Sequence, residues 1–398
     1  MTEREGKTFF WDRIRGAMGG VVETGTMGLA LIIAIQIFKA PDSIKGIVAA
    51  AGPLGLFLNP LSLSLFCRLK YSANKIAAFL FFISGGLMLV AASSWSLMSF
   101  LIPTCLAFCL AAQVMPLIVQ IWTNNYPSNK RGAYMAVCMM FSIACTLAYS
   151  LLSGWLLDKD LDLFRYVLAG IAVAYMLGGA ALFKMPSIAL SKSSSQNPIA
   201  NLSYAIEDKK FGLMLLSWMF LGFGNLMVLP LRFDYLLRDE YGIEASKFMV
   251  TLLTLGVPAF FRFASSRFWG ALFDRINFML LRLILNIIIM VAISLFFISK
   301  NYWVIGISTA LFGIAMGGAN ISWSLWVTKF ATPERTAAYM SVHTFTTGIR
   351  GILAPFVGYY LLSMFGAQTT GLIGTSLVVV SVLLVWALFQ STRSKTAI

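Results

Sequence analysis

Charged residues are scarce in this chain: they make up 12% of its 398 residues, and 59% are hydrophobic. A soluble protein keeps roughly a quarter of its residues charged. The apolar residues fall in runs of about 20, the length that crosses a lipid bilayer as a helix. Because a bilayer offers no water to backbone groups, each run must be helical. The scarcity of charge therefore excludes an ordinary soluble protein and predicts an all-α integral membrane protein.

Histidine and cysteine are scarce as well. The chain has one histidine and five cysteines, and all five cysteines lie in the first half. One histidine cannot build a histidine-based metal site, and the cysteine spacing is not that of a zinc site. We expect no metal and no cofactor, and we interpret the cysteines as small apolar core residues.

Basic residues outnumber acidic ones, and the formal net charge is +14. They lie mostly in short loops rather than on one soluble face, which argues against a nucleic-acid partner. With the N-terminus in the cytoplasm, about 20 Lys and Arg fall inside and about seven outside. We therefore expect a multi-pass protein of the plasma (inner) membrane, with both termini cytoplasmic, an even number of spans and the lipid bilayer as its surroundings.

Twelve membrane spans are predicted. The first apolar run has no evident cleavage site, so it is interpreted as an uncleaved helix rather than a signal peptide. A polar stretch containing SKSSSQNP separates spans 6 and 7, and it predicts an N-terminal half (1–184), a linker (185–211) and a C-terminal half (212–398). The spans are about 14–38, 44–66, 76–94, 97–122, 132–157, 163–184, 212–236, 246–270, 276–299, 302–327, 336–363 and 367–391.

The two halves repeat each other weakly. Trp122, Arg131 and Gly154 recur 204 positions later as Trp326, Arg335 and Gly358. A common offset of about half the chain length indicates two related six-helix halves. In this register Met139 corresponds to His343 and Thr146 to Arg350, so only the second half carries these two polar side chains.

The loop after span 8 reads GALFDRINFMLLR from Gly270. Gly270, Asp274 and Arg275 match a Gly-x-x-x-Asp-Arg signature, and the chain thereby resembles the major facilitator superfamily. The resemblance extends to Arg131–Gly132 and Gly154 in span 5, but the first-half signature is eroded, because the offset puts Lys70 at the position of Asp274.

The resemblance implies twelve transmembrane helices in two pseudo-symmetric halves that rock around a central site. It also implies a transporter rather than an enzyme. Gly270, Asp274, Arg275, Arg131 and Arg335 would belong to its cytoplasmic gate and loop motif.

Four ionisable residues stand out for their depth in predicted spans: Glu23, Arg262, His343 and Arg350. Such a group costs at least ~2.5–3.5 kcal/mol near the bilayer centre and must be compensated. Glu23 either faces a polar cavity or pairs with a neighbouring helix, and Arg350 either faces protein or water at that cavity or forms a buried pair with Glu23. Arg262 either faces the cavity or snorkels to the headgroups. His343, on the same face as Arg350, is either a proton-coupling group or a packing residue.

Neutral polar residues inside the spans also indicate a polar cavity. Gln113, Asn225 and Asn320 lie in spans 4, 7 and 10, which line the central cavity in the family. Their alternative role is hydrogen bonding between helices. Arg232 and Asp234 are either an outer gate or side chains that snorkel at the interface.

The predicted function is secondary active transport of a small polar or anionic organic solute, coupled to H+, by a monomer. Glu23, Gln113, Asn225, Arg262, Asn320 and Arg350 are the predicted solute contacts, and Glu23 and His343 the proton-coupling groups. Arginine suits carboxylate or phosphate. An exporter of amphiphilic compounds, and a receptor or scaffold that transports nothing, remain the alternatives.

Overall fold

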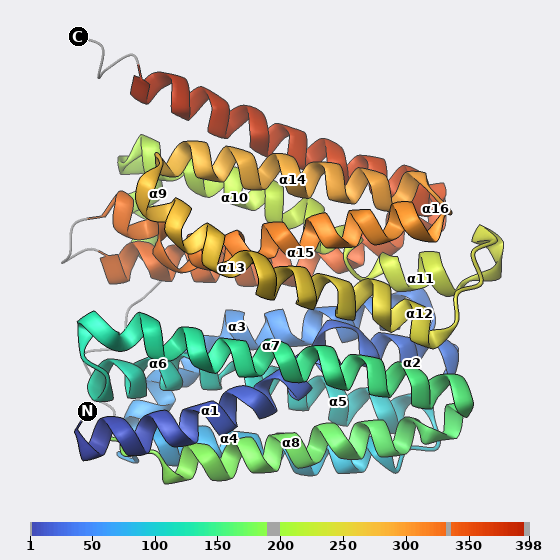
Figure 1. Ribbon diagram of the computed structural model, residues 1–398, viewed down its shortest axis with the longest axis horizontal. Coiled ribbons are helices and arrows are strands. Elements are labelled where there is room, and N and C mark those ends of the chain that lie inside the picture. Colours follow the sequence, from blue (N-terminus) through green and yellow to red (C-terminus); the bar gives the residue numbers. More distant parts are fainter. Residues whose placement is uncertain (1, 189–199, 332–335, 394–398) are drawn as a thin grey trace. The chain divides into compact units, whose positions relative to one another are not determined.

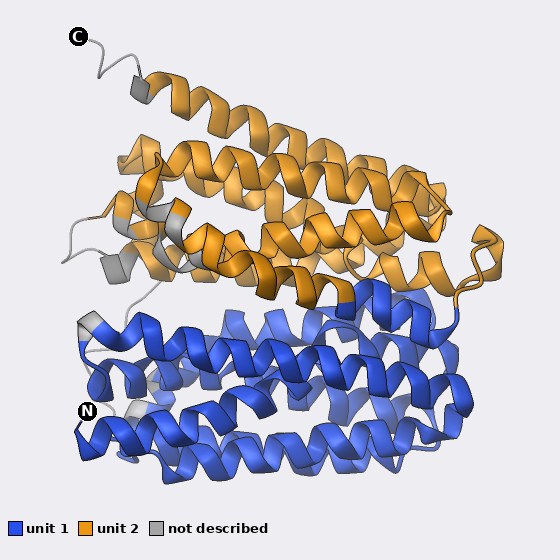
Figure 2. Ribbon diagram, in the orientation of Figure 1, with its two compact units in different colours: residues 1–195, 246–256 blue, residues 196–245, 257–398 orange. Residues whose placement is uncertain are grey.

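The structure is a computed structural model that describes residues 2–188, 200–331 and 336–393. Every regular element in these ranges is a helix. By the clustering of backbone contacts the chain divides into two compact units (Figure 2). Unit 1 comprises residues 1–195 and 246–256, and unit 2 comprises 196–245 and 257–398. The eighth predicted span is therefore shared between the units, which the sequence does not indicate.

Unit 1 is built from long helices joined by short turns (Figure 1). Within it α7 packs against α1 and α12, and α8 packs against α1 and α4. The elements are α1 (Glu3–Thr24), the π-helical η1 (Gly25–Leu29), α2 (Ala30–Gln36), α3 (Asp42–Arg68), α4 (Ala73–Ala92), α5 (Leu97–Ala112), α6 (Val114–Asn125), α7 (Ser128–Lys159), the 3-10 helix η2 (Leu161–Leu163), α8 (Phe164–Lys184), α12 (Lys247–Thr251) and the π-helical η6 (Leu252–Gly256).

Unit 2 has α16 packed against α10 and α14, and α15 packed against α13 and α14. Of the predicted linker, residues 189–199 lie outside the described residues and Ala200–Glu207 are helical. The elements are η4 (Ala200–Leu202), α9 (Ser203–Glu207), α10 (Lys209–Val228), α11 (Leu231–Leu237), η5 (Asp239–Tyr241), α13 (Val257–Arg275), α14 (Phe278–Ile298), α15 (Tyr302–Leu325), η7 (Trp326–Lys329) and α16 (Thr336–Arg393).

Ten helices of the described chain are long and apolar enough to cross a membrane. Helices cover all twelve predicted ranges, but α3 is not among these ten, and the last candidate, Tyr339–Ser391, contains two predicted spans. Gly366 interrupts that helix with φ 74° and ψ 172°, a conformation that favours glycine because it has no Cβ. The count of twelve therefore stays a prediction.

Local sequence explains where several helices begin. Thr2 and Glu5 form a reciprocal capping box at α1, with both hydrogen bonds 3.2 Å long. Asp208 accepts hydrogen bonds from the first backbone N–H groups of α10. Because α1 begins at Glu3, the mixed-charge N-terminal residues form its first turns rather than a separate segment.

Pro258 marks an irregular point in the eighth predicted span. It has no N–H to continue the helical ladder, and the five residues before Val257 are π-helical. An uninterrupted α-helix would put Thr254, Pro258 and Arg262, which are spaced by four, on one face. The π-turn holds more residues than an α-turn and so takes Thr254 out of this alignment.

Candidate functional site

Glu23 lies on α1 of unit 1 and is half-buried. Its Oε2 is 3.3 Å from Oγ1 of Thr146, on α7. The same hydroxyl lies 3.1 Å from the carbonyl oxygen of Gly20 and 3.0 Å from that of Ser142. A threonine hydroxyl has one proton to donate and can also accept. Thr146 can therefore donate to an ionised Glu23, or accept from a protonated Glu23 while donating to a carbonyl.

The backbone changes directly after Glu23. Residues Gly25–Leu29 are π-helical, a widening that is common at functional positions in membrane and soluble helices. The hydroxyl of Thr26 donates to the Glu23 carbonyl at 3.0 Å. Glu23 is thus the last residue but one of a regular helix, next to the point where the backbone becomes irregular.

Gln113 ends α5 in unit 1 and is buried. Its Nε2 donates to the carbonyl oxygen of Gly55 at 2.6 Å, and its Oε1 accepts from Ser62. Both partners lie on α3. The structure therefore gives Gln113 hydrogen bonds between helices of unit 1, and its predicted contact with a solute stays a prediction.

Three predicted solute contacts lie in unit 2. Arg262 on α13 and Asn320 on α15 are half-buried. Asn225 on α10 is half-buried too, and its Oδ1 is buried with no hydrogen-bond partner in the part of the chain that the structure describes. An orphan amide oxygen in a span is a position where a hydroxyl or N–H of a solute gains a hydrogen bond.

Arg350 and His343 lie on α16 and are buried, with 5% and 0% of their surface exposed. Nη1 of Arg350 donates to the carbonyl oxygen of Trp218, on α10. The ring of His343 lies 5.4 Å from that of Trp218 and 5.1 Å from that of Trp326. The structure thus brings both side chains to Trp218, on the same side of α16.

Arg282 joins this group, although the sequence predicts it at the cytoplasmic end of span 9, among the basic residues that set topology and that follow the loop signature. It lies on α14, is fully buried, and its Cζ stacks 3.3 Å from the centre of the Trp218 ring. Apolar residues on both sides, MLLRLIL, are the signal that places it inside a span. Arg282, His343, Arg350, Trp218 and Trp326 are called the arginine cluster below.

Unit 1 has a buried polar group of its own, which sequence reasoning missed. Asp12 on α1 is fully buried and accepts from Nε of Arg15 at 2.6 Å and from Nε1 of Trp122 at 2.7 Å. The phenol of Tyr126 donates to the same carboxylate at 3.2 Å. Burial, together with the nearby charge of Asp12, raises the pKa of Tyr126, so it keeps the proton that it donates. These four residues are called the aspartate cluster.

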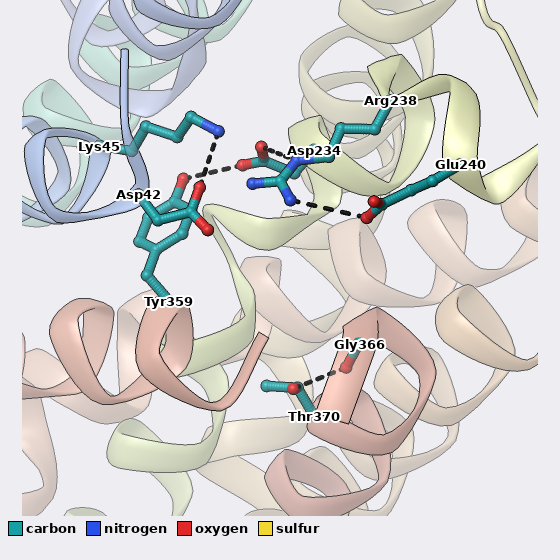
Figure 3. Close-up of polar contacts among 8 residues, drawn as sticks. All are labelled: Asp42, Lys45, Asp234, Arg238, Glu240, Tyr359, Gly366 and Thr370. Carbon is teal, nitrogen blue, oxygen red and sulfur yellow. Dashed lines mark hydrogen bonds and ion pairs between the residues drawn. The ribbon is translucent and has the colours of Figure 1, made fainter. Parts of the chain in front are cut away.

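Asp234 on α11 is fully buried. Its carboxylate accepts hydrogen bonds from two side chains (Figure 3). It accepts from Nε of Arg238 at 2.8 Å and from the hydroxyl of Tyr359 at 3.1 Å. The guanidinium of Arg232 is also buried and lies 4.2 Å from the ring centre of Phe312. Neither Arg232 nor Asp234 snorkels at the surface, so that interpretation of the sequence is wrong.

The structure describes only some residues of the predicted cytoplasmic gate and loop motif. Arg131 donates to the carbonyl oxygens of Thr123 and Tyr126, and so closes the end of α6. Gly270 and Asp274 lie in α13, which ends at the exposed Arg275, and the side chain of Asp274 is outside what the structure describes. Arg335 lies outside the described residues. The gate role of these residues stays a prediction.

Within the described residues, no group of three or more His, Cys, Asp or Glu is arranged to hold a metal ion. Long apolar helices that carry a carboxylate, several guanidinium groups and orphan polar atoms define a class of protein, the multi-span transporters of the membrane. The Major Facilitator Superfamily model matches residues 17–355, and the chain belongs to this family. It is therefore an integral membrane transporter rather than an enzyme, and the resemblance drawn from GALFDR is confirmed.

Solved structures share the fold. A mutant of the nucleoside transporter NupG has a TM-score of 0.77 at 14% identity, covering 96% of this chain and 100% of that chain. A D-xylose-proton symporter has 0.70 at 15% identity, with 96% and 98% covered. A bacterial homologue of the human lysosomal transporter Spinster, inward-facing and occupied, has 0.69 at 13% identity, with 98% of each covered. Among curated proteins no match is found.

Proposed function

We propose that this chain is a proton-coupled secondary transporter of a small polar or anionic organic solute. The observation that carries the coupling is Glu23 with Thr146: an in-span carboxylate with a threonine hydroxyl as a hydrogen-bond partner, which suits either protonation state. The π-helical segment that begins two residues later adds to this assignment. A transporter driven by a proton gradient needs a group of this kind, which gains and loses a proton during each cycle.

The solute class follows from the balance of charge and polar atoms in unit 2. Arg232, Arg282 and Arg350 are buried there, and Asp234 is the one fully buried carboxylate among its described side chains. Surplus positive charge disfavours a cationic amphiphile as cargo and favours an anion. The orphan amide oxygen of Asn225 suits a hydroxyl or N–H donor. Similar structures are those of a nucleoside transporter and a D-xylose-proton symporter, both of which carry polar solutes by their titles.

We assign proton coupling to Glu23 and solute contact to Arg262, Asn225 and Asn320, which are half-buried and so accessible in part. We further propose that the protein imports the solute together with H+ by alternating access. It does so as a monomer in the plasma membrane. Arg350 and His343 are buried deep in contacts of their own unit, and their predicted solute and proton roles remain predictions.

Flux into proteoliposomes tests this function. Purified protein is reconstituted and given a pH gradient with labelled nucleosides, sugars and small carboxylates, and with cationic dyes as the competing cargo. We expect uphill uptake of one polar or anionic solute. Glu23→Gln should abolish gradient-driven uptake yet retain counterflow exchange, because only the proton step is removed. Glu207→Gln, which changes an exposed carboxylate, is the matched control and should retain both.

Three results would contradict the proposal, in whole or in its coupling step. Transport of dyes but not polar solutes would make the protein an exporter of amphiphilic compounds, and no flux of any kind would favour a receptor or scaffold. Unchanged uphill uptake by Glu23→Gln would remove Glu23 from the coupling step.

A further inference from the structure

The arginine cluster contains several buried polar atoms that have no hydrogen-bond partner among the described residues. These include Nε and both Nη atoms of Arg282 and Nε of Arg350, whereas Nη1 of Arg350 donates to Trp218. Both ring nitrogens of His343 and Nε1 of Trp326 also lack a hydrogen-bond partner among the described residues. All four side chains are at least nine-tenths buried. Orphaned buried polar atoms are rare in folded proteins, and here they gather in one place.

The positive charge of the cluster is uncompensated among the described residues. Neither Arg282 nor Arg350 forms an ion pair there, and the two guanidinium groups act on each other electrostatically. A buried cation is stable only when a charge partner or hydrogen bonds replace its lost water. The Trp218 ring supplies a cation–π contact, but a ring accepts none of these in-plane N–H groups. The missing partner must therefore be negative and a hydrogen-bond acceptor.

Unit 1 shows what such a partner looks like. Trp122 and Trp326 share the 204-residue register, and each lies near the end of its span. The indole N–H of Trp122 donates to the Asp12 carboxylate, which also pairs with Arg15. The Trp326 ring contacts those of His343 and Trp218, and its indole N–H has no acceptor among the described residues. In the described chain, unit 1 thus supplies a carboxylate to its tryptophan and unit 2 does not.

We propose that unit 2 binds a small inorganic anion, of the size of chloride, in the arginine cluster. Arg282, Arg350, the neutral imidazole N–H of His343 and the indole N–H of Trp326 are its donors. The anion must be small because the cluster is closely packed: Arg282 stacks at 3.3 Å on Trp218, and a Cβ added at Gly222 would collide with the Arg350 guanidinium. This bound anion completes the fold of unit 2 and is distinct from the solute, whose anionic character the buried Arg232 and the half-buried Arg262, both outside the cluster, still favour.

The test is anion-dependent unfolding of the purified full chain in detergent. A bulky sulfonate salt is replaced by chloride, bromide or nitrate at constant ionic strength, and the unfolding temperature is recorded. We expect a saturable rise of a few degrees, because a ligand that binds only the folded state stabilises it by mass action. Acetate and larger carboxylates, run in parallel, distinguish a free inorganic ion from the anionic group of a solute.

Three variants make the result specific. Arg282→Met should lose the anion response and unfold no earlier than wild type in the sulfonate, since an apolar side chain replaces an uncompensated charge. His343→Glu should lose the response because it supplies a tethered carboxylate. Arg232→Met removes another buried arginine of unit 2, one that lies on Phe312, and should keep the full response.

The proposal is overturned if wild type shows no saturable rise with any small inorganic anion. It is also overturned if Arg282→Met and His343→Glu respond as wild type does, because the effect of salt would then lie elsewhere. A response to organic carboxylates alone would assign the cluster to a solute instead. A variant that merely misfolds cannot mimic the expected outcome, which is undiminished stability without the anion.

Discussion

The aspartate cluster of unit 1 and the arginine cluster of unit 2 are built on tryptophans at matching positions in the repeat. In unit 1, Asp12 receives the indole N–H of Trp122, the guanidinium of Arg15 and the phenol of Tyr126. In unit 2, the Trp326 ring contacts those of His343 and Trp218, and its indole N–H has no acceptor among the described residues. The comparison teaches that two related halves can keep the same donor and differ in where the negative charge comes from.

A second pair of matching positions differs in the same way. Thr146 and Arg350 share the register, and each donates to a main-chain carbonyl on the first long helix of its unit, Gly20 and Trp218 respectively. The hydrogen bond is retained while the side chain changes from neutral to charged. Unit 2 therefore carries a buried positive charge at the position where unit 1 carries a neutral hydroxyl.

The largest expected effect comes from making unit 1 resemble unit 2. Asp12→Asn leaves Arg15 without its carboxylate and gives Trp122 and Tyr126 a weaker acceptor. Removing one partner of a buried pair costs about 3 kcal/mol or more. Thermal unfolding of the purified protein should show this loss, and chloride should restore part of it. Glu240→Gln, in an exposed pair with Arg238, is the control at about 0–1 kcal/mol. If Asp12→Asn and Glu240→Gln lowered the unfolding temperature equally, the buried carboxylate would contribute no more to stability than the exposed one.

A smaller effect separates the two tryptophans. Trp122→Phe and Trp326→Phe lose similar volume, but only Trp122 also loses a hydrogen bond to a charged group, which contributes about 1.5–3 kcal/mol. In chloride-free buffer Trp122→Phe should be the more destabilising by about that amount. Adding chloride should narrow the gap, because Trp326 then has a partner to lose. Unfolding measured with and without chloride checks both statements, and equal costs without chloride would show that Trp326 already has an acceptor.

The smallest contrast concerns close-packed glycines. A Cβ at Gly20 would collide with the main-chain carbonyl of Ser142, whereas a Cβ at Gly222 would collide with the end of the flexible Arg350 side chain. We expect Gly20→Ala to cost about 1–3 kcal/mol, and Gly222→Ala about 1 kcal/mol less. Gly86→Ala meets no atom within 4 Å and should be neutral or stabilising. Denaturant unfolding measures all three, and a Gly222→Ala cost equal to that of Gly20→Ala would mean that Arg350 cannot move.

Much of the architecture follows from the sequence alone, because burial of backbone polar groups in lipid leaves helices as the only spanning structure for apolar runs. The predicted ranges accordingly coincide with helices, and Gly366 separates the last two. The π-helical turns after Glu23 and before Val257 were not predictable, because glycine and proline permit such a turn without requiring it.

The polar residues divide in an instructive way. Glu23, His343 and Arg350 stand out because they interrupt apolar runs near the middle of a span. Asp12 and Arg282 lie near span ends, where charged side chains usually reach water, so sequence rules count them as loop or topology residues. Only the packing of neighbouring helices shows that both are fully buried. The partners of a charge near a span end therefore depend on tertiary structure.

The central claim is that the arginine cluster holds a small anion, and bromide tests it most directly. Crystals of the full chain grown or soaked in bromide would be measured at the bromine absorption edge. The account predicts one strong anomalous peak in unit 2 within hydrogen-bond distance of Arg282, Arg350 or Trp326 Nε1. An ordered cluster without such a peak, its donors satisfied by protein groups alone, would contradict it.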